Sequence, residues 1–114
     1  MQIMEWWLFG GRVRSLTLYA IAALKDSYAT EIALVVGAHR PNIQRLLGEF
    51  ESAGVIVSRG IRVRRVSLNP RFAAARELSA LLDRLIETDP AFLERLALAR
   101  RRPRRPGKSL EPSR

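Results

Sequence analysis

At 114 residues, the chain is long enough for one domain with a single modest core. It contains no cysteine, which excludes disulfides, thiolate metal sites and redox sensing through thiols. Its formal net charge of +9 favours an acidic partner, with nucleic acid first and an anionic membrane surface second.

Residues 1–11 form an aromatic N-terminal segment, with Trp6, Trp7 and Phe9 in one apolar run. Glu5 is acidic where a secretory signal peptide needs basic residues, and no stretch approaches the roughly 20 apolar residues of a membrane span. We therefore expect a cytoplasmic protein that does not enter a membrane.

Two helices are predicted next. Apolar residues at helical spacing predict the first over residues 12–25. Thr30 is predicted to be the N-cap of a short second helix over residues 31–36, and Gly37 is predicted to end it.

A third helix is predicted to begin at His39 or Arg40, with Pro41 in its first turn, where the missing amide costs no helical hydrogen bond. Gly54 is predicted to cap its end. The apolar residues at helical spacing, which we expect to be buried, are Ile43, Leu46, Leu47 and Phe50.

The second and third helices have the spacing of a helix-turn-helix. Ala33 is small enough to let two helices cross closely, and Gly37, four residues later, permits a tight turn. Ile43 and Leu46 then seat the second helix of the pair on the first. A generic pair of helices does not need all four residues at these intervals, so the spacing predicts this motif.

β-Branched residues then replace leucine and alanine, and they predict a two-stranded hairpin over residues 55–68 with a short turn near Arg59 and Gly60. Helical spacing returns over residues 71–87. Asp89 and Pro90 are predicted to cap and begin a last helix that ends near Arg101.

This order of elements resembles the winged helix-turn-helix family of bacterial and archaeal transcription regulators. Over residues 8–88, four stretches are similar to ArsR-like regulators: Leu8-Phe9-Gly10 with Arg12 and Arg14, Tyr28 to Ala33, Leu46 to Ile56, and Ser67 to Pro70. The resemblance implies a mainly α fold with a small two- or three-stranded antiparallel β wing. The chain departs from the family in its very short wing and in lacking the cysteine and histidine clusters of the metal-sensing members.

The predicted organisation has four parts: the aromatic segment at residues 1–11, a winged helix-turn-helix domain at 12–88, a C-terminal helix at 89–101, and a basic, flexible tail at 102–114. Most of the net charge lies at the end, because residues 100–114 carry +6 and residues 1–99 carry +3. A nucleic-acid interface must therefore be argued from where the charges of the folded part lie.

Once its apolar residues face inward, the third helix presents the residue types that contact base edges in the major groove. A solvated helix face is the alternative, but the helix-turn-helix spacing favours DNA. The predicted DNA-binding residues of the third helix are Arg40, Asn42, Gln44 and Arg45. Three residues at the starts of the two helices are also predicted to bind DNA: Thr30, His39 and Pro41.

The hairpin adds four arginines in a region with no acidic residue between Ala53 and Arg76: Arg59, Arg62, Arg64 and Arg65. Strand alternation would put Arg62 and Arg64 on one face and Arg65 on the other, so we expect two or three of the four to contact phosphates. A solvated edge whose charges prevent strand-to-strand aggregation is the alternative, and both can hold together.

His39 is the only histidine and has no partner with metal-ligand spacing, so capping or a phosphate contact is expected rather than catalysis. No nucleophile elbow or glycine-rich phosphate loop accompanies the serines and acids. We expect no enzymatic activity, no cofactor and no bound metal.

Two interpretations of the large apolar residues outside the helix-turn-helix stay open. They could form a dimer interface, as the outer helices do in ArsR-like dimers. Alternatively, they could cover the domain's own core. The residues concerned are Trp6, Trp7, Phe9, Phe92, Leu93 and Leu96. The tail's arginines could hold a second stretch of DNA backbone or form a flexible, solubilising end.

The sequence therefore predicts a sequence-specific, double-stranded DNA-binding transcriptional regulator that acts as a homodimer, with repression as the favoured mode. The third helix would enter the major groove, and the wing arginines would contact phosphates. The alternative is a winged helix module that holds a partner protein and binds DNA weakly or not at all.

Overall fold

The computed structural model describes residues 5–101. The predicted basic tail at residues 102–114 lies outside this range. Within it, none of the helices is both long and apolar enough to cross a membrane.

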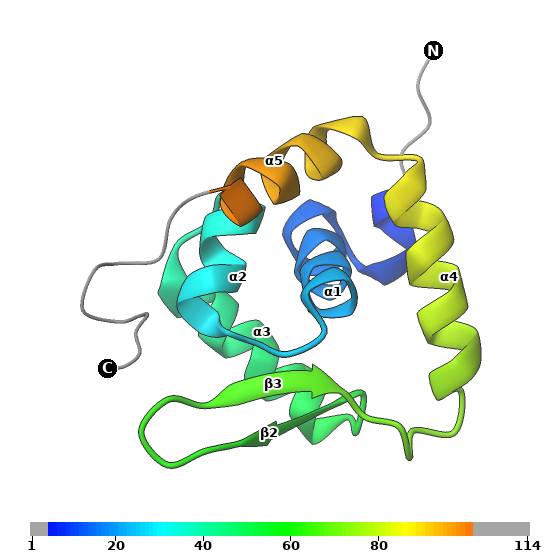
Figure 1. The fold of residues 1–114 in the computed structure, drawn as a ribbon. Coiled ribbons are helices and arrows are strands. Elements are labelled where there is room, and N and C mark those ends of the chain that lie inside the picture. Colours follow the sequence, from blue (N-terminus) through cyan, green and yellow to red (C-terminus); the bar gives the residue numbers. More distant parts are fainter. Residues whose placement is uncertain (1–4, 102–114) are drawn as a thin grey trace.

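The helix α1 (Arg12–Leu24) occupies the middle of the molecule (Figure 1). The short 3-10 helix η1 (Glu5–Phe9) precedes it, and the pair α2 (Ala29–Val36) and α3 (Arg40–Ser52) follows. After the sheet, α4 (Ala75–Glu87) lies on the side of α1 opposite to α2, and α5 (Pro90–Arg101) crosses from α4 to α2.

The sheet has three antiparallel strands in the order β1-β3-β2. These are β1 (Ser27–Tyr28), β2 (Ile56–Arg59) and β3 (Arg65–Leu68). The described residues thus form a mainly helical fold with a small antiparallel sheet, which confirms the predicted fold class.

The core is built around α1, which is buried on all sides from Ser15 to Ala22. A helix surrounded by protein must satisfy its polar side chains locally. The hydroxyl of Ser15 donates to the carbonyl of Gly11 at 2.7 Å, and that of Thr17 donates to the carbonyl of Val13 at 2.7 Å. α1 can therefore serve as the scaffold against which η1, α2, α3 and α4 pack.

The helix-turn-helix pair is formed as its spacing predicts. Gly37, after α2, adopts the left-handed conformation with φ 77°, and Gly54, after α3, has φ 82°. His39 is the N-cap of α3, and Pro41 lies in its first turn. The predicted interior stripe is also confirmed, because Ile43, Leu46, Leu47 and Phe50 are buried.

The predicted N-cap of α2 is wrong. The helix begins at Ala29 with Tyr28 as its N-cap, so Thr30 lies inside the first turn and is exposed. The cause is β1, which pairs Ser27 with Val66 and Tyr28 with Arg65 and carries the chain directly into the helix.

The hairpin differs from the prediction in its turn. Arg59 pairs with Arg65, so residues 60–64 form a five-residue loop and Ile61–Val63 belong to no strand. The wing is therefore longer at its tip than a short turn at Gly60 would make it.

The start of α4 is also later than predicted, at Ala75 rather than Arg71. Asn69 holds the preceding turn: its Oδ1 accepts from the backbone amide of Arg71 at 2.9 Å, and its amide donates to the carbonyl of Gly54 at 2.9 Å. The start of α5 is as predicted, since the backbone amide of Phe92 donates to Asp89 Oδ1 at 3.1 Å.

Candidate nucleic-acid interface

The outer face of α3 is polar along its first two turns. Burial of Ile43 and Leu46 fixes the rotation of the helix, and the side chains between them point away from the core. The residues left exposed on and just before these turns are His39, Arg40, Pro41, Asn42, Gln44 and Arg45. This face carries guanidinium and carboxamide groups, which can donate to and accept from base edges.

A groove of about 420 Å³ lies between α3, the start of α2 and the wing. It brings together five residues that the sequence predicts to bind DNA: Thr30, Arg40, Gln44, Arg62 and Arg64. Gly48 lines the same groove and has no heavy atom within 4 Å of where a Cβ would stand, so the backbone of α3 is uncovered there. The groove therefore offers cations on two sides of an open channel.

The other predicted DNA-binding residues lie outside the lining of the groove: His39, Pro41, Asn42, Arg45, Arg59 and Arg65. Tyr28, Glu51 and Ser58 line it, although the sequence prediction did not include them. Tyr28 reaches the groove through the pairing of β1 with β3, which has no signal in local sequence.

Acidic side chains from other elements hold three of the four wing arginines. Asp26 pairs with Arg59 at 2.7 Å and with Arg65 at 3.1 Å. Glu51 of α3 pairs with Arg64 at 3.1 Å. Although no acid lies between Ala53 and Arg76 in the sequence, three of the four wing arginines are therefore paired in the fold.

Arg62 differs from its neighbours. It makes no ion pair among the described residues, and it is exposed. The predicted division of Arg62 and Arg64 from Arg65 by strand alternation is wrong, because only Arg65 lies in a strand.

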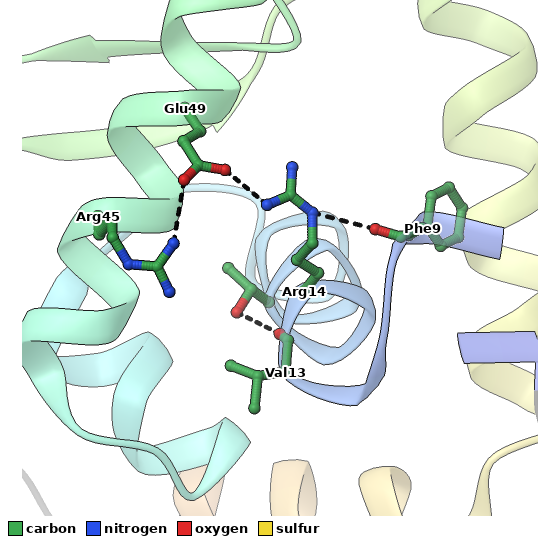
Figure 2. Close-up of polar contacts among 6 residues, drawn as sticks. Phe9, Val13, Arg14, Arg45 and Glu49 are labelled. Carbon is green, nitrogen blue, oxygen red and sulfur yellow. Dashed lines mark hydrogen bonds and ion pairs between the residues drawn. The ribbon is translucent and has the colours of Figure 1, made fainter. Parts of the chain in front are cut away.

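A second ion-pair network joins α3 to α1 (Figure 2). Glu49 accepts from Arg14 at 2.5 Å and from Arg45 at 3.0 Å. The hydrogen bond from Arg14 lowers the pKa of the Glu49 carboxyl below its usual value, and Arg45 adds to the shift. Arg45 is thus tethered along α3 in the free protein.

Arg14 also connects this network to the N-terminal segment. Its Nε donates to the carbonyl of Phe9 at 3.1 Å (Figure 2). Its guanidinium also lies 5.2 Å from the centre of the Phe50 ring. One side chain therefore links η1, α1 and the base of α3.

The structure divides the residues considered for a dimer interface. Phe92 and Leu96 are 1% and 5% exposed and belong to the core, so they have no surface to offer a second chain. Trp6 and Phe9 are partly buried against the core. Trp7, at 74% exposed, and Leu93, at 39%, point outward.

Within residues 5–101, no three side chains of the histidine, aspartate and glutamate types cluster as metal ligands would. Comparison with protein-family models, curated proteins and solved structures finds no match to this chain.

Proposed function

We propose that this protein is a sequence-specific, double-stranded DNA-binding transcriptional regulator, with α3 in the major groove and the wing on the phosphate backbone. The observation that carries the proposal is the groove between α3 and the wing. Its two walls carry Arg40 and Gln44 on one side and Arg62 and Arg64 on the other. An open channel with arginines on both walls suits an anionic phosphodiester strand.

The start of α2 supports the same orientation. Ala29 and Thr30 line the groove, and the first amides of a helix have no intrahelical acceptor. Such amides, together with the Thr30 hydroxyl, are donors suited to a phosphate. A strand in the groove would then be contacted from α2, α3 and the wing at once.

Base contacts would come from the exposed residues in the first two turns of α3. Asn42, Gln44 and Arg45 are exposed and carry the groups that pair with adenine or guanine edges. Arg45 would have to exchange its contact with Glu49 for a base or a phosphate. Because that ion pair is solvent-exposed, the exchange costs little.

The proposal includes a homodimer that acts by repression through occupancy of its site. Two copies of α3 in successive major grooves would be about 34 Å apart and would require a roughly palindromic sequence. Trp7 and Leu8 of η1 and Leu93 and Leu98 of α5 are exposed apolar side chains that the two flanking segments offer for self-association. If they instead held a different protein, DNA binding would be weak or absent, as in the alternative derived from the sequence.

Two substitutions separate base recognition from phosphate contact. Asn42→Ala removes a base-edge partner, so we expect a loss of about 1–3 kcal/mol on the selected site and almost none on unrelated duplexes. Arg62→Ala removes a phosphate contact, so we expect weaker binding to every duplex and a salt slope smaller by about 1. Fluorescence anisotropy at several salt concentrations measures both effects.

Arg84→Ala is the matched control, because Arg84 lies on α4 outside the groove and its loss changes the net charge equally. For a contact to about six phosphates, the wild-type log-log salt slope would be near −5. Unchanged DNA affinity in both Asn42→Ala and Arg62→Ala would refute the proposal.

A further inference from the structure

The tip of the wing is a tightly folded loop. It spans residues 60–64 between the paired residues Arg59 and Arg65. Gly60 has φ 102°, and a Cβ at this position would collide with the carbonyl oxygen of Val63. The loop therefore turns back on itself at its base and projects its middle residues outward.

The wing is also fixed relative to α3. Glu51 of α3 accepts from Arg64 at 3.1 Å and from the hydroxyl of Ser58 at 2.8 Å. Arg64 donates in addition to the Ser58 hydroxyl. These contacts join the strand β2 and the loop to the same residue of α3, so they place the tip beside the groove in the free protein.

The most exposed large apolar side chain of the described residues lies at this tip. Ile61 is 99% exposed and Val63 is 53% exposed. Ile61 therefore contributes no packing to the free protein. Single exposed apolar residues are common on protein surfaces, so exposure alone assigns no role. The informative feature is that Ile61 adjoins Arg62 and Val63, which line the groove, while its own side chain lies outside the lining.

Duplex geometry fixes what the tip would meet. A single phosphodiester strand separates the major groove from the adjacent minor groove. With α3 in the major groove and that strand between α3 and the wing, the loop at residues 60–64 lies over the minor groove. Arg62, which contacts that strand, then lies at the edge of the minor groove, whose negative potential favours arginine.

We propose that Ile61 enters the minor groove and acts as a wedge at a base step, so that the protein bends the DNA it binds. The inference rests on the proposed function and extends it from contact to deformation. Apolar side chains inserted between base steps partly unstack them and bend the duplex toward the major groove. Flexible steps such as TA and CA/TG would accept the wedge at the least cost.

Other occupants of the tip are less compatible with its composition. The centre of a protein–protein interface is a broad buried apolar patch, whereas the tip offers only Ile61 and Val63 among several arginines. A membrane anchor would need a broad apolar face, and the tip offers two aliphatic side chains. A polyanion with an apolar interior behind its charges matches both features.

DNA bending tests the inference directly. The full chain is mixed with duplexes labelled at both ends, and energy transfer between the labels reports the end-to-end distance. We expect the wild type to shorten this distance on its selected site and Ile61→Ser to lose most of the shortening. Affinity of the variant should fall about tenfold on sites with a TA step under the wing, and little on a stiff A-tract site.

Leu81→Ser on α4 is the matched control, because Leu81 is an exposed aliphatic residue outside the groove. It should bend DNA as the wild type does, and thermal unfolding should show that both variants are folded. If the wild type binds its selected site but leaves the DNA straight, and Ile61→Ser binds equally well, the wedge is refuted while the proposed function stands.

Absence of any wild-type binding to duplex DNA would instead refute the proposed function and the wedge with it. Vesicles of phosphatidylglycerol and phosphatidylcholine provide a separate comparison. Loss of vesicle binding in Ile61→Ser, with DNA bending unchanged, would assign the tip to membranes and overturn the inference.

Discussion

Two carboxylates determine how much positive charge the wing presents. Asp26 pairs with Arg59 and Arg65, and Glu51 pairs with Arg64. All of these side chains are substantially exposed, and exposed ion pairs contribute about 0–1 kcal/mol each. In the proposed complex, DNA phosphates would displace the carboxylates, and each exchange would reduce the net gain from an arginine contact.

Glu51→Gln should consequently strengthen binding to duplexes of any sequence. The glutamine can still accept from the Ser58 hydroxyl, while Arg64 becomes available to phosphate. We expect affinity for a non-cognate duplex to rise about threefold to tenfold, with a steeper salt dependence, as measured by anisotropy titration.

Glu87→Gln gives the same change in net charge at an ion pair on α4, away from the groove. It should raise affinity much less. Equal gains in the two variants would mean that Glu51 acts only through the total charge and would contradict its local role.

These residue-scale contacts could not be obtained from the sequence. The four arginines at positions 59–65 stand out because no acid lies near them along the chain. Asp26 reaches them only because β1 pairs with β3, which places Ser27 opposite Val66. Glu51 reaches Arg64 because the loop is five residues long, whereas the sequence predicts a short turn.

At the scale of elements, the glycines that end α2 and α3 determine how the helix-turn-helix and the wing are joined. Gly37 and Gly54 both have left-handed backbone conformations. Gly48, within α3, has ordinary helical geometry and open space around it. The three positions therefore allow backbone strain to be separated from the general effect of adding a methyl group.

Gly37→Ala and Gly54→Ala should each lower the free energy of unfolding by about 1–2 kcal/mol, because an L-residue is strained at these φ values. The guanidinium of Arg95, which covers Gly37, is the end of a flexible side chain and can move aside. Denaturant titrations followed by circular dichroism measure the changes.

Gly48→Ala is the control and should raise stability by about 0.5–1 kcal/mol, as expected for glycine replaced inside a helix. If Gly37→Ala were as stable as the wild type, the turn between α2 and α3 would not require the left-handed conformation.

The elements that sequence predicts well are those with local signals. Gly37, Gly54 and the Asp89-Pro90 pair mark helix ends through backbone chemistry, and the apolar stripe of α3 follows from helical spacing. The elements it misses depend on distant pairing. The two-residue strand β1 exists because β3 lies beside it, and this strand moves the N-cap of α2 from Thr30 to Tyr28.

For the whole molecule, the total charge is a weaker argument than the arrangement of three elements. Residues 1–99 carry only +3 of the formal +9. The groove nevertheless gathers cationic and polar side chains from the start of α2, the outer face of α3 and the wing. That convergence is the physical basis for the proposal that the protein binds duplex DNA.

The central claim is that this surface recognises a DNA sequence, and selection of bound fragments from a random duplex library by the full chain tests it most directly. We predict enrichment of a roughly palindromic site with half-sites about one helical turn apart. The enrichment should be lost with Asn42→Ala and retained with Arg84→Ala. Recovery of fragments with no sequence preference at physiological salt would contradict the account.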